Sequence, residues 1–210
     1  MHCYMWHIAG NYADNNPQVL LSHKDEFLHI CRKIEDGCKD IHIRLDALNM
    51  QAKILWAEGN TDEALEIYRK NFSYWWETFG QKAEQLFSKD TPEFMYWVRR
   101  NSYELVTFAG DKLVKTVFFD KDMSYDERVK KAEHYGDLMT NLYEETKEPF
   151  FLVLERSIFG RLTNDLYYRG GEESDAKRVE KKLIASKEKL AELAKTYPIV
   201  AFFAGKSYCG

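Results

Sequence analysis

This chain of 210 residues is 45% hydrophobic and 30% charged, a composition typical of a folded globular protein. A formal net charge of −4 argues against a nucleic-acid partner, because binding to phosphates requires clustered lysine and arginine. The longest fully apolar run covers only residues 199–204, whereas a membrane span needs about 20 apolar residues, so we expect no membrane partner.

The first predicted helix pair covers residues 1–36. Asn16 and Pro17 have the pattern of an N-cap followed by a proline in the first helical turn. The helix that they open carries a regular apolar face and is expected to end at Gly37.

This helix also carries the candidate metal ligands of the chain. Glu26 and His29 lie three residues apart, with His23 one turn earlier, and pairs of this spacing bind metal ions in helical bundles. Such bundles need a second pair, which the sequence lacks, and a solvated helix face explains the spacing equally well. We therefore predict no metal site and no cofactor.

The second predicted pair covers residues 39–80 and contains a short helix-to-helix corner. Apolar residues repeat at three- and four-residue spacing before the corner, at Leu45, Leu48, Ala52, Leu55 and Trp56. Gly59 then occupies the position where a left-handed residue ends a helix, and Asn60 or Thr61 can cap the next one. A connection this short makes the two helices antiparallel.

The segment GNTDEALEIYRK resembles the second helix of a tetratricopeptide repeat (TPR). Ala52 and Ala64 lie twelve residues apart, as the two small residues of that repeat do. Gln51 and Asn71 stand where the family prefers Leu and a small apolar residue, and no proline closes the unit. The resemblance covers residues 45–72 and implies stacked helix pairs that bind a peptide or protein segment on a curved surface.

Helical-repeat regions of this kind are similar to the sensory halves of bacterial helix-turn-helix regulators that bind signalling peptides. No helix-turn-helix occurs in this sequence, so the similarity is an analogy. The pattern starts at Met1 without a capping residue, which suggests the C-terminal portion of a longer protein or a divergent copy.

Aromatic residues concentrate near the middle of the chain and form a second candidate binding region. Adjacent tryptophans cannot both face one core, so we expect one of Trp75 and Trp76 to lie near a surface or groove. The candidate peptide- or ligand-binding residues are Asn49, Lys53, Trp56, Trp75, Trp76, Trp97, Arg99, Arg100, Asn101 and Glu155. Core packing for the aromatic residues and solvation for the polar ones are the alternatives.

The third and fourth predicted pairs cover residues 91–146 and 149–197. One long helix is expected from Thr91 through Val117, and Ser124 and Glu127 form a capping box for the next. Glu148-Pro149 opens a further helix that ends at residues 170–171. Ser174 or Asp175 is expected to cap the last one. Residues 198–210 form a tail that we leave unassigned.

Glu155 falls inside an otherwise apolar stripe formed by Leu152, Phe159, Leu162 and Leu166. A buried carboxylate must find a donor or take up a proton, and we expect the partner on another helix. Arg99, Arg100 and His134 are the candidates for that partner. The role is either a structural ion pair or a ligand-contacting acid with a raised pKa.

These patterns predict one all-α domain over residues 1–210, with about eight helices in stacked antiparallel hairpins, a TPR-like α-solenoid. The expected function is a non-enzymatic, regulatory or scaffolding module that binds a peptide or protein segment. The alternative is a helical-bundle enzyme or small-molecule binder that uses Glu155 and the central aromatic cluster, with a metal in one version. A homodimer through residues 176–193 is a further expectation, from their heptad-like spacing.

Four cysteines without CxxC spacing and an N-terminal sequence that does not have the pattern of a secretion signal predict reduced thiols and a cytoplasmic protein.

Overall fold

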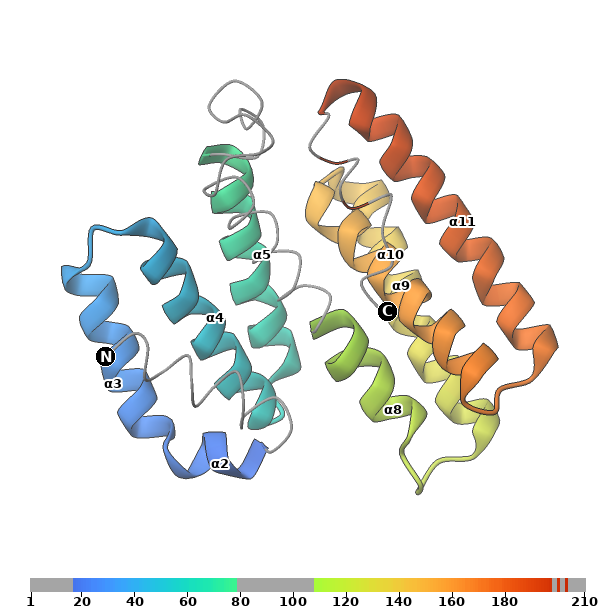
Figure 1. Cartoon of the computed structure of the whole chain (residues 1–210), viewed down its shortest axis with the longest axis horizontal. Helices are drawn as coiled ribbons and strands as arrows, with labels where there is room; N and C mark the ends of the chain where they lie inside the picture. Colours follow the sequence, from blue (N-terminus) through green and yellow to red (C-terminus); the bar gives the residue numbers. More distant parts are fainter. Residues whose placement is uncertain (1–16, 79–107, 198–199, 201–202, 204–210) are drawn as a thin grey trace. The chain divides into compact units, whose positions relative to one another are not determined.

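The computed structural model describes residues 17–78, 108–197, 200 and 203 (Figure 1). Within these residues all regular structure is helical and no strand occurs, which confirms the all-α prediction for the described part. The chain divides into two compact units, Met1–Glu77 (unit 1) and Thr78–Gly210 (unit 2), and each is described by itself. The predicted single domain over residues 1–210 stays a prediction.

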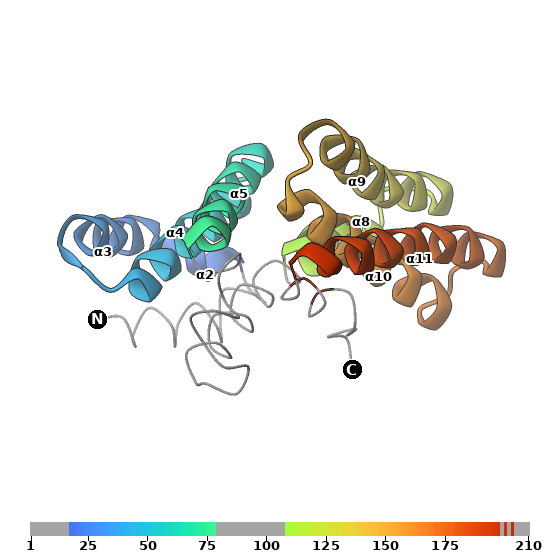
Figure 2. The same ribbon diagram turned by 90° about the horizontal axis from the view of Figure 1, so that it is seen from above.

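The described part of unit 1 contains four helices, α2 (Pro17–Ser22), α3 (Lys24–Gly37), α4 (Ile41–Ala57) and α5 (Thr61–Thr78). Helices α3, α4 and α5 run antiparallel to their chain neighbours and lie side by side in that order (Figures 1 and 2). Proline is the first described helical residue, and Gly37 ends α3, both as predicted. The predicted uninterrupted helix is wrong, because His23 leaves helical geometry, with φ −116° and ψ 15°, between α2 and α3.

The core of unit 1 lies where α2, α3 and α4 meet. Its buried members are apolar and come from all three helices: Leu20, Phe27, Ile30, Cys31, Ala47, Met50 and Ile54. The Cys31 thiol is completely buried, and burial raises its pKa to about 12, so this cysteine packs as a small apolar residue.

The corner between α4 and α5 has the predicted geometry. Gly59 adopts φ 89°, where a side chain is strained. The Asn60 N–H donates to the Leu55 carbonyl oxygen at 2.9 Å, and the Gly59 N–H donates to the Trp56 carbonyl oxygen at 2.9 Å. These two bonds form a Schellman motif and satisfy the last carbonyl groups of α4. The corner therefore turns the chain back within three residues, 58–60.

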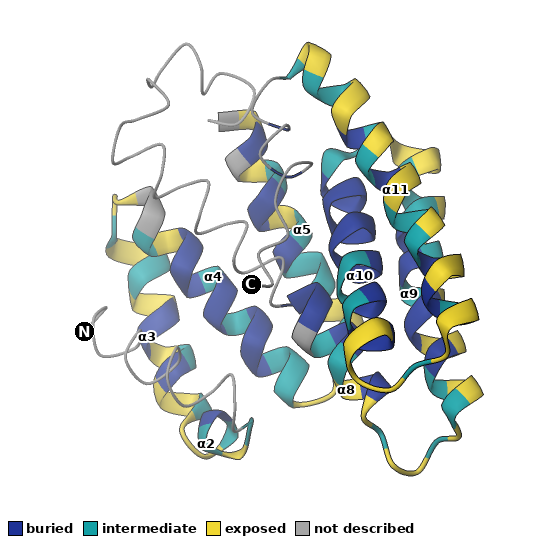
Figure 3. Ribbon diagram, turned by 45° about the vertical axis from the view of Figure 1, so that its right-hand side comes forward, coloured by how far each residue is buried: buried dark blue, intermediate teal, exposed yellow. Residues whose placement is uncertain are grey.

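Unit 2 contains a π-helix, η3 (Phe108–Lys115), and helices α8 (Thr116–Phe118), α9 (Tyr125–Thr146), α10 (Pro149–Tyr168) and α11 (Glu173–Thr196). Helix α10 lies against α9, α11 and η3, and Figure 3 shows it as buried along most of its length. The bundle in unit 2 is therefore built around α10.

The predicted helix reaching Val117 is confirmed over the described residues 108–118, and Ala109, Leu113 and Val117 are buried as expected. Phe108–Lys115 is a π-helix and not an α-helix, and residues 91–107 lie outside the described part. In η3 buried residues lie four apart, Ala109 with Leu113, and also five apart, Phe108 with Leu113 and Ala109 with Val114. The i→i+5 bonding of a π-helix brings the pairs five apart to one face, whereas an α-helix does not. A four-residue spacing, which the sequence also offers, suggested an ordinary α-helix instead.

Three of the predicted helix boundaries in unit 2 are confirmed. Ser124 and Glu127 form a capping box, with the Glu127 N–H donating to Ser124 Oγ at 3.3 Å and the Ser124 N–H to Glu127 Oε2 at 3.0 Å. Helix α10 begins at Pro149 and ends before Gly170, which has φ 91°.

The predicted cap of α11 is wrong. The N-cap position is Glu172, not Ser174 or Asp175, and no side-chain cap bond forms there. Instead the Glu172 N–H donates to the hydroxyl oxygen of Tyr125 at 2.7 Å. A residue from the first turn of α9 thus supplies the acceptor that a local cap would normally provide.

The heptad-like stripe of α11 is buried inside unit 2. Ala176, Val179 and Leu190 are each 0% exposed within the single chain. A homodimer through this helix would therefore use its outer face, where Ile184 is 50% exposed, and it stays a prediction. Among the described helices none is long and apolar enough to cross a bilayer.

We predict that Gly136→Ala destabilises unit 2 although Ala is the better helix former. A Cβ at Gly136 would lie 2.3 Å from Cε1 of Phe159, a ring that is 1% exposed and cannot move aside. Overpacking of this kind costs about 1–3 kcal/mol, more than the roughly 1 kcal/mol gained in helix propensity. Chemical denaturation measures the change.

Gly160→Ala is the matched control, since it is also a helix-interior position but its Cβ would meet Leu183 at an ordinary 3.7 Å. It should be neutral or stabilising by up to about 1 kcal/mol. Phe159→Leu should reduce the penalty of Gly136→Ala. Equal effects of the two glycine substitutions would contradict the packing argument.

Candidate functional site

The structure describes about half of the predicted binding residues. In unit 1, Asn49 and Lys53 are 5% and 7% exposed, and Trp56 is half-buried. The side chain of Trp75 lies outside the described residues, as do Trp97, Arg99, Arg100 and Asn101. In unit 2, Glu155 is 2% exposed.

Trp76 is a buried residue of α5. It is 7% exposed and stacks on Phe72, with ring centroids 6.1 Å apart and planes inclined by 10°. Stacked rings that are this buried contribute packing energy to the fold.

Helix α4 carries a buried polar stripe. Asp46, Asn49 and Lys53 follow one another at i, i+3 and i+7, and each is less than 8% exposed. Residues of α4 offset by one position, Ala47 and Ile54, belong to the core shared with α3. Helix α4 is therefore buried on more than one side. For this reason its polar residues are also shielded from solvent.

The stripe meets a polar residue of α5, Asn71, which is 2% exposed. Its Nδ2 donates to Asn49 Oδ1 at 2.6 Å and to the Leu45 carbonyl oxygen at 3.2 Å. Its Oδ1 is buried and has no hydrogen-bond partner among the residues described. We call Asn49 and Asn71 the amide pair.

Asn71 was missed as a site residue in the sequence. Its signal was visible, since it stands where a tetratricopeptide repeat prefers a small apolar residue. A departure of this kind from the repeat pattern does not by itself distinguish a buried polar group with a role from a solvated side chain. A buried acceptor without a partner costs about 1–3 kcal/mol, so its presence needs a reason.

The three candidate metal ligands of α3 face solvent. His23, Glu26 and His29 are all exposed, and His23 Nδ1 lies 3.8 Å from Glu26 Oε2. Nowhere in the described residues do three His, Cys, Asp or Glu side chains come together as a metal site would require.

Glu155 lies in the apolar stripe that the sequence predicted. Leu152, Phe159 and Leu162 on the same face are each 0–1% exposed. The partner comes from another helix, as expected, but it is Ser186 of α11, whose Oγ donates to Glu155 Oε1 at 2.6 Å. His134 is wrong as the partner because its side chain is exposed. Arg99 and Arg100, the other candidates, lie outside the described residues.

Burial dominates the electrostatics of Glu155. It raises the pKa of this carboxyl, and the hydrogen bond from Ser186 and the charge of Lys189 offset the rise only in part. Lys189 Nζ lies 3.9 Å from Glu155 Oε1 but 3.0 Å from Glu144 Oε1. Hydrogen bonds from Lys147 and Lys189 lower the pKa of Glu144 to about 2, so the lysine is shared with a fully charged carboxylate.

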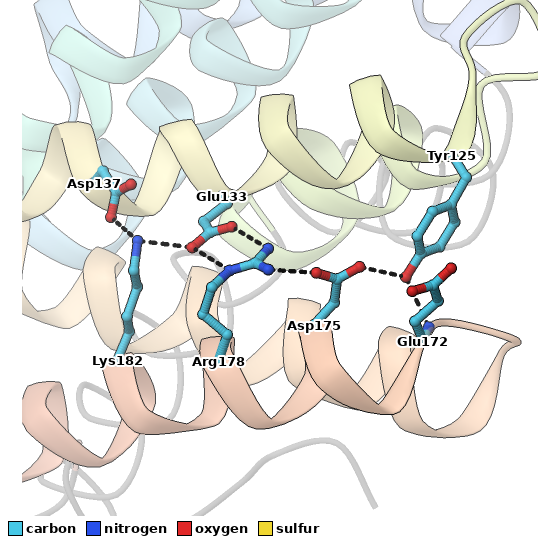
Figure 4. Close-up of polar contacts among 7 residues, drawn as sticks. All are labelled: Tyr125, Glu133, Asp137, Glu172, Asp175, Arg178 and Lys182. Atoms are coloured by element: carbon cyan, nitrogen blue, oxygen red, sulfur yellow. Dashed lines mark hydrogen bonds and ion pairs between the residues drawn. The ribbon is translucent and has the colours of Figure 1, made fainter.

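A row of polar contacts, the α9–α11 clamp, joins the two helices that flank Glu155 (Figure 4). Its acids on α9 face cations on α11, and its residues are Tyr125, Glu133, Asp137, Glu172, Asp175, Arg178 and Lys182. Glu133 accepts from Arg178 Nη2 at 2.8 Å and from Lys182 Nζ at 2.8 Å. Burial alone would raise the pKa of Glu133, but these bonds outweigh it and lower the pKa.

Tyr125 ends the clamp with two bonds through one hydroxyl. It accepts from the Glu172 N–H and donates to Asp175 Oδ2 at 2.9 Å. The clamp fixes the position of α11 along α9, and with it the height at which Ser186 faces Glu155.

Comparisons of the chain with protein-family models, with curated proteins and with solved structures gave no match.

Tyr125→Phe is expected to destabilise unit 2 by about 0.5–1.5 kcal/mol, because it removes both the acceptor for Glu172 and the donor to Asp175. Thermal or denaturant unfolding measures the loss. Tyr168→Phe serves as the control, since Tyr168 is 84% exposed and should change stability by less than about 0.5 kcal/mol. Identical stabilities of the two variants would show that the hydrogen bonds of Tyr125 do not contribute to the stability of unit 2.

Proposed function

We propose that this chain is a non-enzymatic, cytoplasmic helical-repeat module of the TPR-like class, with a regulatory or scaffolding role. In this proposal an extended peptide or protein segment binds along α4 and α5. The Schellman corner at Gly59 and the fully buried Ala52 and Ala64 support the likeness of this hairpin to a tetratricopeptide repeat.

The single observation that carries the proposal is the unpartnered Oδ1 of Asn71. Both hydrogens of its amide group are committed inside the hairpin, to Asn49 and to Leu45, so the orientation of the side chain is fixed. The remaining acceptor suits a backbone N–H, which an extended peptide presents at alternate residues.

A peptide reaches this acceptor only when the side chains around it shift, because Asn71 is 2% exposed. The free chain leaves the acceptor unsatisfied, so the new hydrogen bond offsets part of the cost of that shift. Asn49 and Lys53 lie on the same stripe of α4 and place further polar groups beside the bound backbone.

A second candidate function, a small-molecule binder or enzyme in unit 2, is favoured by Glu155. Its carboxyl is buried, its pKa is raised, and Oε2 has no hydrogen-bond partner in the described part of the chain. Acidic groups with raised pKa values serve as proton donors in many sites. The central aromatic residues of this alternative lie largely outside the described residues.

Peptides selected from a display library of linear sequences on the full chain provide the test. Fluorescence anisotropy should show that Asn71→Leu weakens binding about tenfold or more, equivalent to about 1.4 kcal/mol for one lost hydrogen bond. Asn141→Leu, at an exposed asparagine of α9, is the matched control and should bind as the wild type does.

An N-methyl scan of the bound peptide separates binding from folding. Methylation of the one amide that donates to Asn71 should weaken binding to the wild type but not to Asn71→Leu, because that hydrogen bond is already absent in the variant. If Asn71→Leu folds and binds as tightly as the wild type, or if Glu155→Gln abolishes binding instead, the peptide proposal is wrong.

A further inference from the structure

Glu155 has too few hydrogen-bond donors for an ionised carboxylate. A carboxylate offers about four acceptor positions, and buried ones normally use several of them. Here Ser186 Oγ supplies one donor at 2.6 Å, while Oε2 is buried and unpartnered among the described residues. A side-chain hydrogen bond with Thr140 of α9 also lowers the pKa of Glu155, but the single hydroxyl hydrogen of Thr140 is shared with the Gly136 carbonyl oxygen at 3.1 Å.

The charges around Glu155 do not supply the missing stabilisation. From α11, Lys189 faces the carboxyl at 3.9 Å, beyond hydrogen-bond distance, and it is held more closely by Glu144 of α9. Glu144 is itself a like charge that disfavours ionisation of Glu155. On α10, Arg156 is the next residue and points about 100° away around the helix.

Among the described helices, η3 also packs against α10, and its Gly110 contact lies further along that helix. Gly110 of η3 lies against the side chain of Arg161, and six residues separate Arg161 from Glu155, about 9 Å along the helix axis. The groups that act directly on Glu155 therefore come from α9 and α11.

Counting hydrogens shows which protonation state the geometry fits. Ser186 has one hydroxyl hydrogen, and its Oγ lies 2.6 Å from Glu155 Oε1 and 3.1 Å from the Lys182 carbonyl oxygen. A protonated Glu155 donates to Ser186 Oγ, and Ser186 then donates to Lys182, so both contacts are hydrogen bonds at once. When Glu155 is ionised, the single hydroxyl hydrogen of Ser186 is donated to the carboxylate, and the hydrogen bond to the Lys182 carbonyl oxygen is lost.

We propose that Glu155 is a proton-sensitive contact between α10 and α11, neutral in the closed bundle, whose ionisation at rising pH loosens α11. The loosening follows because an ionised Glu155 must reach water, and α11 with Ser186 is the element that separates it from the outer face of unit 2.

The direction of the effect with pH follows from the pKa. Burial raises the pKa of Glu155 above its ordinary value of about 4.3, so the folded chain binds a proton more tightly than the unfolded chain. The stability due to the neutral group is complete below the unfolded pKa and is lost as pH rises through the folded pKa.

Thermal unfolding of the full chain and of Glu155→Gln between pH 4 and 9 tests the proposal. Gln is a neutral substitute of the same shape and can still donate to Ser186. The melting temperature of Glu155→Gln minus that of the wild type should increase as pH rises and then level off. Carboxylates with lowered pKa, such as Glu133 and Glu144, contribute equally to both proteins and cancel in this difference.

Glu145→Gln, an exposed residue of α9, is the matched control and should give a difference that does not change with pH in this way. Hydrogen exchange locates the effect: amides of α11 in the wild type should lose protection, beyond the ordinary pH dependence of exchange, as the pH rises above the ordinary pKa of a glutamate. The same amides in Glu155→Gln should keep their protection.

A pH-independent difference, or a Glu155→Gln protein that becomes relatively less stable at high pH, would overturn the proposal and make Glu155 an ionised partner of Lys189. If Glu155→Gln does not fold, Lys189→Met decides. Removal of this cation should make the loss of stability begin at higher pH, since a neutral Glu155 is then favoured further. Loss of an ion pair would instead destabilise Lys189→Met at neutral pH without moving the loss of stability to higher pH. That result contradicts the proposal.

Discussion

The burial of α10 on several sides is the constraint on which unit 2 depends. A helix in this position must be largely apolar, yet α10 carries polar groups that cannot reach water. Two acids on this helix differ in where their hydrogen-bond and charge partners come from. Asp165, 1% exposed, is paired with Arg161 at 3.0 Å and Arg169 at 3.4 Å, each one turn away on the same helix. Glu155 has no such local cation and depends on α9 and α11. Asp165 is thus supported by the helix itself, whereas Glu155 is supported only when the bundle is assembled.

The clamp and the apolar core contribute to the unit 2 bundle in different ways. In the ion pair of Arg178 with Glu133 the arginine is half-exposed, and pairs with an exposed partner individually contribute little free energy. Their value lies in register, because the acids of α9, Glu133 and Asp137, face the cations of α11, Arg178 and Lys182, in this alignment. The apolar residues of α10 supply the stabilising burial, and Gly136 lets the ring of Phe159 approach α9 closely. Together they determine which residue of α11 faces Glu155.

Unit 1 also contains a buried polar group with incomplete hydrogen bonds, on α5. Asn71 lies where close helix packing favours a small apolar side chain, and its amide is retained by bonds to α4. The amide pair keeps one acceptor unsatisfied in the free chain, as Glu155 keeps one oxygen unsatisfied in unit 2. In both units the position of interest is a buried polar group whose hydrogen bonds are incomplete, and such groups commonly mark sites under a constraint other than stability.

The sequence alone determined the features that depend on contacts within five residues along the chain. The ends of helices at Gly59 and Gly170 and the capping box at Ser124 could be predicted, since the φ requirement and the capping bonds are local. The burial of Glu155 could also be predicted, from the periodicity of its own helix. Only the tertiary structure decided the rest: the cap that Tyr125 provides for Glu172, 47 residues away, and the contact of Ser186 with Glu155, 31 residues away. These contacts depend on how far one helix slides along another, a quantity that packing and the matched charges of the clamp fix and that no periodicity within a single helix contains.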